Sequence, residues 1–282
     1  MQLGGEVLGS IVGLLAALSW GSGDFLGGVL SKRMSITHVV LVSQGVALTT
    51  SMIFAISLSE PLPSQRSAIY GLLAGLPLAL ANLAYYRALA NYNMGLISPS
   101  AGILSAVLAV LFGSLVFGPP SLIKSVGMCV ALAGISLASY NRNTKISLDS
   151  IKLTSYSGAG FGLFYVLFSL LEKGEVFWPL TLTRLTLLVT LFGLIKFDLS
   201  GLRPGLLPHL PGLMLLGLLD LGGTVLFVYS NNLAGIQVAA VLTSYYPLPT
   251  ILLSRLILRE KAKRLQSIGA FMTLIAVPLV NA

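Results

Sequence analysis

Two aspartates interrupt apolar stretches of this chain that otherwise carry no charge. Asp24 lies in ALSWGSGDFLGGVLSKR (17–33), and Asp220 lies in LLGLLDLGGTVLF (215–227). A charged side chain at the centre of a bilayer costs about 2.5–3.5 kcal/mol on insertion scales, and such residues face a protein interior or a water-filled cavity. We therefore expect each aspartate either to accept a proton or pair with a substrate amine, or to be a structural residue hydrogen-bonded to a neighbouring helix.

Helical spacing gives each aspartate a companion on the same face. Trp20 precedes Asp24 by four residues, and Thr224 follows Asp220 by four. Trp20 would supply an aromatic wall, and Thr224 would extend a polar stripe along a cavity. Gly222 and Gly223 are expected to loosen their helix locally, as in the discontinuous helices of transporters.

One arginine also lies within an apolar run. Arg184 follows Thr181 and Thr183. Its guanidinium could hold a substrate carboxylate in a bidentate fashion or neutralise one of the aspartates. Its position six residues into the run equally fits a side chain that extends to the lipid headgroups.

Further polar side chains recur at helical spacing in two other runs. Asn82 and Tyr86 share one face, and Tyr246 shares another with Thr243 and Thr250. Pro247 and Pro249 lack amide hydrogens, so we expect a kink that leaves carbonyls free for a ligand. Ordinary packing, with the tyrosine hydroxyls bonded to neighbours, is the alternative for each residue.

The composition requires a membrane for this chain. Of its 282 residues, 55% are hydrophobic and only 9% are charged, whereas soluble domains carry about 25% charged residues. Unbroken Leu, Val, Ala and Gly runs favour helices over the alternating strands of a barrel, and the first run is read as a retained helix rather than a cleaved signal. The sequence predicts an all-α polytopic protein of ten transmembrane helices. The ten segments are 7–30, 37–58, 67–90, 95–117, 122–139, 153–171, 178–197, 209–232, 236–258 and 263–281.

The cations lie mainly in the breaks between these segments, so the net charge of +8 indicates membrane topology rather than nucleic-acid binding. Successive breaks alternate between the two sides of the membrane, and the breaks on one side hold most of the cations. This side is predicted to be cytoplasmic, so both termini are predicted to lie on the outer side of the cell membrane. The cations on the cytoplasmic side are Lys32, Arg33, Arg142, Lys145, Lys152, Arg203, Arg259, Lys261, Lys263 and Arg264, against Arg66, Lys124 and Lys173 on the other side.

The chain divides into two similar halves at its longest polar break, 140–152. Segments 121–137 and 263–279 align without gaps, with Gly127 on Gly269, and Trp20 aligns with Tyr165. We assign 1–141 and 142–282 as two five-helix repeats. Five is an odd number, so the repeats must cross the membrane in opposite directions. Many secondary transporters have this inverted repeat, with the substrate site at the midplane between the halves. We expect the first, third, fourth, sixth, eighth and ninth segments to line a central cavity there.

The paired halves, Trp20-Gly21, the Tyr86-Arg87-Ala88-Leu89 run and Glu260 with Gly269 resemble the EamA-like branch of the drug/metabolite transporter superfamily. The first half departs from the pattern, because Gly118-Pro119-Pro120 stands where a glutamate is usual. The resemblance implies export or exchange of small metabolites such as amino acids or drug-like compounds, without an enzymatic step. It also implies that both termini are cytoplasmic, in conflict with the charge distribution.

Two other functions remain open. Gly21-Ser22-Gly23-Asp24 spells G-x-G-D, and intramembrane aspartyl proteases use such a motif with a second aspartate. Here Asp220 follows the motif in a Leu-Asp pair, whereas those proteases place a Tyr-Asp pair before it. A passive uniporter or channel would share the transporter fold. No metal or cofactor motif and no G-x-x-x-x-G-K-[ST] signature is present, so we expect a small-molecule substrate, a lipid bilayer and a monomer or homodimer, with no nucleic acid.

Reporter fusions test the orientation that the charges predict. A reporter active only in the cytoplasm should be inactive when fused after Ala282, and active when inserted in the 140–152 break, which belongs to the cation-rich set of breaks. Activity after Ala282 together with silence in the 140–152 break would establish the orientation that the resemblance implies.

Overall fold

A computed structural model describes residues 2–138, 140, 147–195, 207–258 and 264–280. Within these ranges the chain is helical and contains no strand. The helices are α1 (Gln2–Ser31), α2 (Ile36–Ser57), α3 (Gln65–Asn91), α4 (Met94–Phe117), α5 (Leu122–Ala138), α6 (Leu148–Ser169), α7 (Phe177–Ile195), the 3-10 turn η1 (Leu207–His209), α8 (Leu210–Thr243), α9 (Pro247–Leu258) and α10 (Arg264–Val280).

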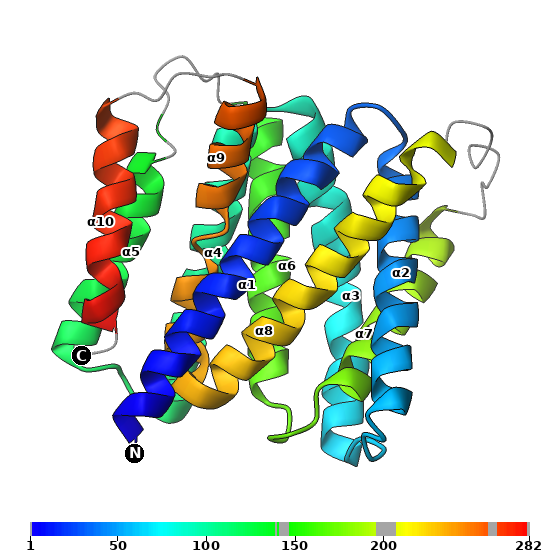
Figure 1. The fold of residues 1–282 in the computed structure, drawn as a ribbon, viewed down its shortest axis with the longest axis horizontal. Helices are drawn as coiled ribbons and strands as arrows, with labels where there is room; N and C mark the ends of the chain where they lie inside the picture. The colour runs from blue at the N-terminus through cyan, green and yellow to red at the C-terminus, as the bar shows by residue number, and fades with distance from the viewer. Residues whose placement is uncertain (1, 139, 141–146, 196–206, 259–263, 281–282) are drawn as a thin grey trace.

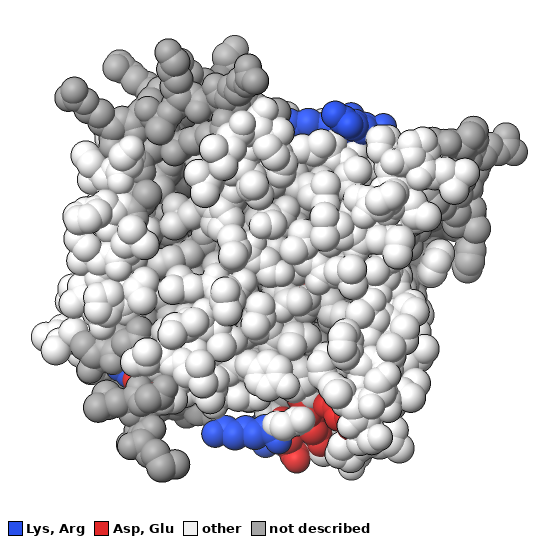
Figure 2. Space-filling model, in the orientation of Figure 1, with Lys and Arg blue, Asp and Glu red and all other residues white. Residues whose placement is uncertain are grey.

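The helices form a bundle whose lateral surface is apolar. Side chains in the middle of several helices point outward, and the exposed fractions of Leu163, Val189 and Leu274 are 52%, 63% and 67%. On the face of the molecule seen in Figure 2, the visible Lys, Arg, Asp and Glu atoms lie toward its two ends. Such a large exposed apolar surface belongs in lipid. The chain is a multi-pass membrane protein.

Six helical stretches within the described residues are long and apolar enough to cross a bilayer. They are Gly5–Ser31, Ile36–Ser57, Gln65–Asn91, Met94–Phe117, Phe177–Leu194 and Leu207–Leu253, and two shorter apolar helices are Leu122–Ala138 and Ser267–Val280. The other predicted segments are helical as well, although length and composition alone do not mark them as spans. α1 begins and α10 ends at the same end of the bundle (Figure 1).

Most of the close helix pairs join the two halves of the chain. α1 packs against α8 and α3 against α6; α3 packs against α7 and α2 against α8; α4 packs against α6 and α1 against α9. In each of these three sets of two pairs, replacing every helix by its counterpart in the other half of the chain, five helices away, gives the other pair. α5 and α10 pair with each other at one edge of the bundle (Figure 1).

Small residues allow these helices to approach closely. On α3, a Cβ on Gly71 would meet the carbonyl of Pro179, and one on Gly75 would meet the carbonyl of Thr183. Gly127 of α5 packs on the backbone at Val280, and Gly269 of α10 packs on the backbone at Ala138. These two contacts are related by the same offset of 142 residues, which is the offset of the sequence alignment.

The kink expected in the ninth predicted segment is confirmed, and it is a turn that divides this segment between two helices. The break before the segment is confirmed, since Gly235 has φ of 79° inside α8, a conformation that glycine adopts without strain. The chain then stays helical only to Thr243, turns, and starts α9 at Pro247. Pro247 is suited to a first helical position because it has no amide hydrogen, and its ring disfavours helical geometry in the residue before it.

Two glutamates join the α2–α3 and α6–α7 connections at one end of the bundle. The Glu60 carboxylate accepts the backbone N–H groups of Val176, Phe177 and Trp178 where α7 begins. The Glu175 carboxylate accepts the backbone N–H of Ser64 at 2.8 Å where α3 begins. Each glutamate thus caps a helix N-terminus, where unpaired N–H groups and the helix dipole favour an anion.

Replacing Glu60 by alanine should therefore destabilise the bundle. It leaves three N–H groups at the start of α7 without their acceptor, and loss of a helix cap costs about 0.5–2 kcal/mol. Denaturant-induced unfolding of the purified protein in detergent micelles measures the change. Glu172→Ala, at an exposed neighbouring position, is the control, and equal stability of the two variants would contradict a capping role for Glu60.

Candidate functional site

A cavity lies within the bundle, between α1, α3, α6, α7 and α8 and beside the turn that precedes α9. Eight of the residues that the sequence singled out border it, whereas Thr181, Thr183, Thr243 and Thr250 do not. The eight are Trp20, Asp24, Asn82, Tyr86, Arg184, Asp220, Thr224 and Tyr246. The cavity encloses about 50 Å³, well below the roughly 300–1,000 Å³ of ligand pockets. The bundle is therefore contracted around its polar residues, with room for a few water molecules or a small head group.

Asp24 faces this cavity without a cation beside it. Its Oδ2 accepts a hydrogen bond from the Tyr85 hydroxyl at 2.6 Å and lies 3.5 Å from the Ser98 hydroxyl. Among the described residues, no Lys, Arg or His side chain pairs with it. Two hydroxyl donors orient the carboxylate but leave its charge uncompensated.

Asp220, in contrast, is neutralised. The Arg184 guanidinium lies 2.9 Å from its Oδ2, and the Gln44 amide donates to the same oxygen at 3.1 Å. Arg184 also donates to the Gln44 carbonyl oxygen at 2.6 Å and to the Thr224 hydroxyl at 2.9 Å. The four side chains form one network that joins α2, α7 and α8.

The interpretation of Arg184 as a headgroup anchor is wrong. Its side chain is only 1% exposed, because α7 presents it to α2 and α8 rather than to lipid. The alternative, in which it neutralises one of the aspartates, is the arrangement observed. Breaking such a buried pair leaves a charge without compensation, a loss of about 3–5 kcal/mol.

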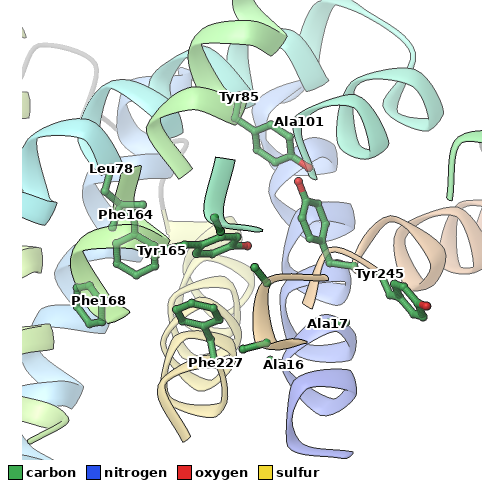
Figure 3. Packing of buried hydrophobic residues seen from close by; sticks show 14 of the residues in the cluster. Ala16, Ala17, Leu78, Tyr85, Ala101, Phe164, Tyr165, Phe168, Phe227 and Tyr245 are labelled. Carbon is green, nitrogen blue, oxygen red and sulfur yellow. The ribbon is translucent and has the colours of Figure 1, made fainter. Parts of the chain in front are cut away.

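Aromatic rings form one wall of the cavity. The Trp20 ring stacks on Tyr165 with centroids 5.8 Å apart, and Tyr165 stacks on Phe227 at 4.6 Å. Figure 3 shows the rings of Phe164, Tyr165 and Phe227 together in one cluster. The Trp20 indole N–H donates to the Asp220 carbonyl at 3.1 Å, which fixes the ring across the α1–α8 contact.

The expectation that Gly222 and Gly223 loosen their helix is wrong. α8 keeps helical geometry through them and departs from it only at Gly235. Gly223 instead lies under the indole of Trp20, where a Cβ would collide with the ring. The glycine therefore positions the aromatic wall.

Three further predicted residues enter from α3 and from the turn before α9. Tyr246 donates its hydroxyl to the Ser98 carbonyl at 3.1 Å, and its own carbonyl leaves no room for a Cβ on Gly21. Asn82 donates its amide to the Leu78 carbonyl of its own helix. Tyr86 packs its ring on Gly27. The Tyr246 hydroxyl and the Asn82 amide thus each donate a hydrogen bond within the protein.

The sequence reasoning missed several residues of this region. Gln44 is an amide in the middle of an apolar run, and the rule that selected Asp24 would have found it. Tyr85 gave no separate signal, because its neighbour Tyr86 has the same chemistry and only tertiary packing decides which ring reaches Asp24. Helix α7 lines the cavity through Arg184, whereas α4, which was expected there, supplies Ser98 beside Asp24 rather than a lining side chain. Glu260 lies outside the described residues.

The comparisons with known proteins agree with this architecture. The EamA-like transporter family matches the sequence twice, over residues 7–140 and 150–282. A protein of known crystal structure has the same fold, with a TM-score of 0.68 at 14% sequence identity over 97% of this chain and 96% of the other. No curated protein matches the sequence significantly. Because the two matched ranges cover nearly the whole chain, the protein belongs to the EamA-like transporter family.

Proposed function

We propose that this protein is a secondary transporter, an exporter or exchanger, that moves small organic metabolites such as amino acids or drug-like compounds across the cell membrane by alternating access. The observation that carries this proposal is the cavity at the contact between the two halves, which holds a carboxylate without a cation. Polar residues buried at membrane depth mark substrate and ion pathways.

Two inverted repeats, 1–141 and 142–282, with ten transmembrane helices in all, would supply the moving parts. Three observations support this division. The family matches the sequence twice, the helix pairs of the two halves correspond, and Gly127 and Gly269 make equivalent contacts. The opposite directions of α1 and α6 in Figure 1 support the inversion. Rocking one repeat against the other would open the cavity alternately to each side.

Asp24 is the central residue of the proposed substrate or proton site. Asp220 has Arg184 as its counter-ion, so the net negative charge of the cavity resides on Asp24. A proton or a cationic group of the substrate can neutralise it, and competition between the two would couple transport to a pH gradient. Trp20, Asn82, Tyr86, Thr224 and Tyr246 would contact the substrate, while Arg184 would hold Asp220.

The alternative functions receive less support. An aspartyl protease needs two carboxylates that share a proton, whereas Asp24 binds Tyr85 and Asp220 binds Arg184 and Gln44. A passive uniporter would use the same cavity without a response to a pH gradient. The monomer and the homodimer are both compatible with the proposal.

Transport by purified protein in proteoliposomes tests the function. With a pooled metabolite mixture read by mass spectrometry, we expect solute movement that strengthens with an imposed pH gradient. Asp24→Asn removes the proton acceptor and should abolish the response to the gradient. Glu6→Gln, which alters another acid of α1 outside the cavity, should behave as the unmodified protein.

The possible outcomes separate the functions. Movement indifferent to the gradient would identify a facilitator or exchanger. If Asp24→Asn transported with unchanged rate and pH dependence, the role of Asp24 would be wrong. Absence of movement, with cleavage of a transmembrane peptide in a parallel assay, would favour the protease.

The ion pair gives a separate prediction about stability. Asp220→Asn leaves Arg184 buried without a counter-charge and should lower the free energy of unfolding by about 3–5 kcal/mol. The double change Arg184→Met, Asp220→Met removes both charges and should recover most of this loss. Unfolding in detergent micelles measures both variants, and Glu6→Gln, in a partly exposed pair with Lys124, should cost at most about 1 kcal/mol. A double variant as unstable as the single one would refute the account.

A further inference from the structure

The charges that border the cavity do not balance. Two carboxylates, Asp24 and Asp220, and one guanidinium, Arg184, are the charged groups among the described residues that line it. The terminal nitrogens of Arg184 bind Asp220, Gln44 and Thr224. Asp24 therefore remains to be neutralised by a proton or by a ligand with a single positive charge.

The walls around that charge are mostly aromatic. Seven of the thirteen residues that line the cavity are Trp, Tyr or Phe. The Tyr85 hydroxyl is bonded to Asp24 and the Tyr246 hydroxyl to the Ser98 carbonyl, so these rings offer faces more than free hydroxyl groups. Aromatic faces attract ammonium groups, and tryptophan does so most strongly.

We propose that the cavity selects small organic cations, in which an amine or ammonium group meets Asp24 and an apolar or aromatic body lies against the rings of Trp20 and Tyr165. This inference rests on the proposed transport function and assigns its substrate class. A buried carboxylate without a cation beside it is neutralised by a proton, and an ammonium group can take the place of that proton, whereas a neutral solute cannot.

The size of the cavity limits which part of the cation it can hold in this structure. About 50 Å³ accommodates an ammonium head group but not an aromatic body. The body would enter when the halves separate, and contraction would then enclose the cation between Asp24 and the rings. The buried Arg184 Nε has no hydrogen-bond partner within the described residues, so a substrate carboxylate is the competing possibility that a test must address.

Tryptophan fluorescence offers a direct binding test, because the chain has two tryptophans and one of them is in the cavity. Trp178 lies far from it, where its indole donates to Glu60, and Trp178→Phe leaves Trp20 as the single reporter. The protein in lipid nanodiscs is titrated with phenethylamine, 2-phenylethanol and phenylalanine. These probes share one body and carry a positive charge, no charge and both charges, respectively.

We expect phenethylamine to change Trp20 emission saturably and to bind about tenfold or more tightly than 2-phenylethanol. Asp24→Asn in the Trp178→Phe background should reduce this preference to less than about twofold, while Glu6→Gln should preserve it. Size-exclusion chromatography of each variant verifies that it is folded.

Three results would overturn the proposal. They are equal binding of amine and alcohol, a preference that survives Asp24→Asn, and tighter binding of phenylalanine than of phenethylamine, which would indicate a zwitterion site that uses Arg184. No response to any probe, from protein that moves solutes in proteoliposomes, would also reject the cation site while leaving the transport function intact.

Discussion

The cost of a charge inside a membrane governs this structure. Arg184 is almost completely buried, and it is stable there because Asp220, Gln44 and Thr224 satisfy its terminal nitrogens. These partners come from α2 and α8, so one electrostatic requirement fixes the mutual positions of three helices. The same requirement distinguishes the two aspartates. Asp220 is paired with Arg184, whereas the partners of Asp24 are hydroxyl groups only.

Packing between small residues brings the two halves close enough for this network to form. Helices from one half contact mainly helices of the other, so the cavity is bordered by both. No single half contains the site, and a movement of one half against the other must change its volume.

The irregular points of the backbone lie on one part of the chain. Gly235 interrupts α8, and the turn before Pro247 separates α8 from α9. Tyr246 belongs to this turn, and it touches α1 at Gly21 and α4 at Ser98. Its position is therefore sensitive to any change in the direction of α9 relative to α1. The turn at Ser244, Tyr245 and Tyr246 is buried, and non-helical backbone at membrane depth is tolerated where it is buried in protein.

The sequence by itself determined the class of protein, the approximate segments, the two similar halves and the polar residues that border the cavity. These follow from composition, from segment length and from the rarity of charge in apolar runs. Tertiary structure decided the partner of Arg184, the choice of Tyr85 over Tyr86 beside Asp24, the entry of Gln44 and the turn within the predicted ninth helix. Helical spacing tells which residues share a face of one helix, but the neighbour that each face meets depends on how close the backbones come. That distance is set by glycines on both helices together, a property of the packed bundle rather than of any one segment.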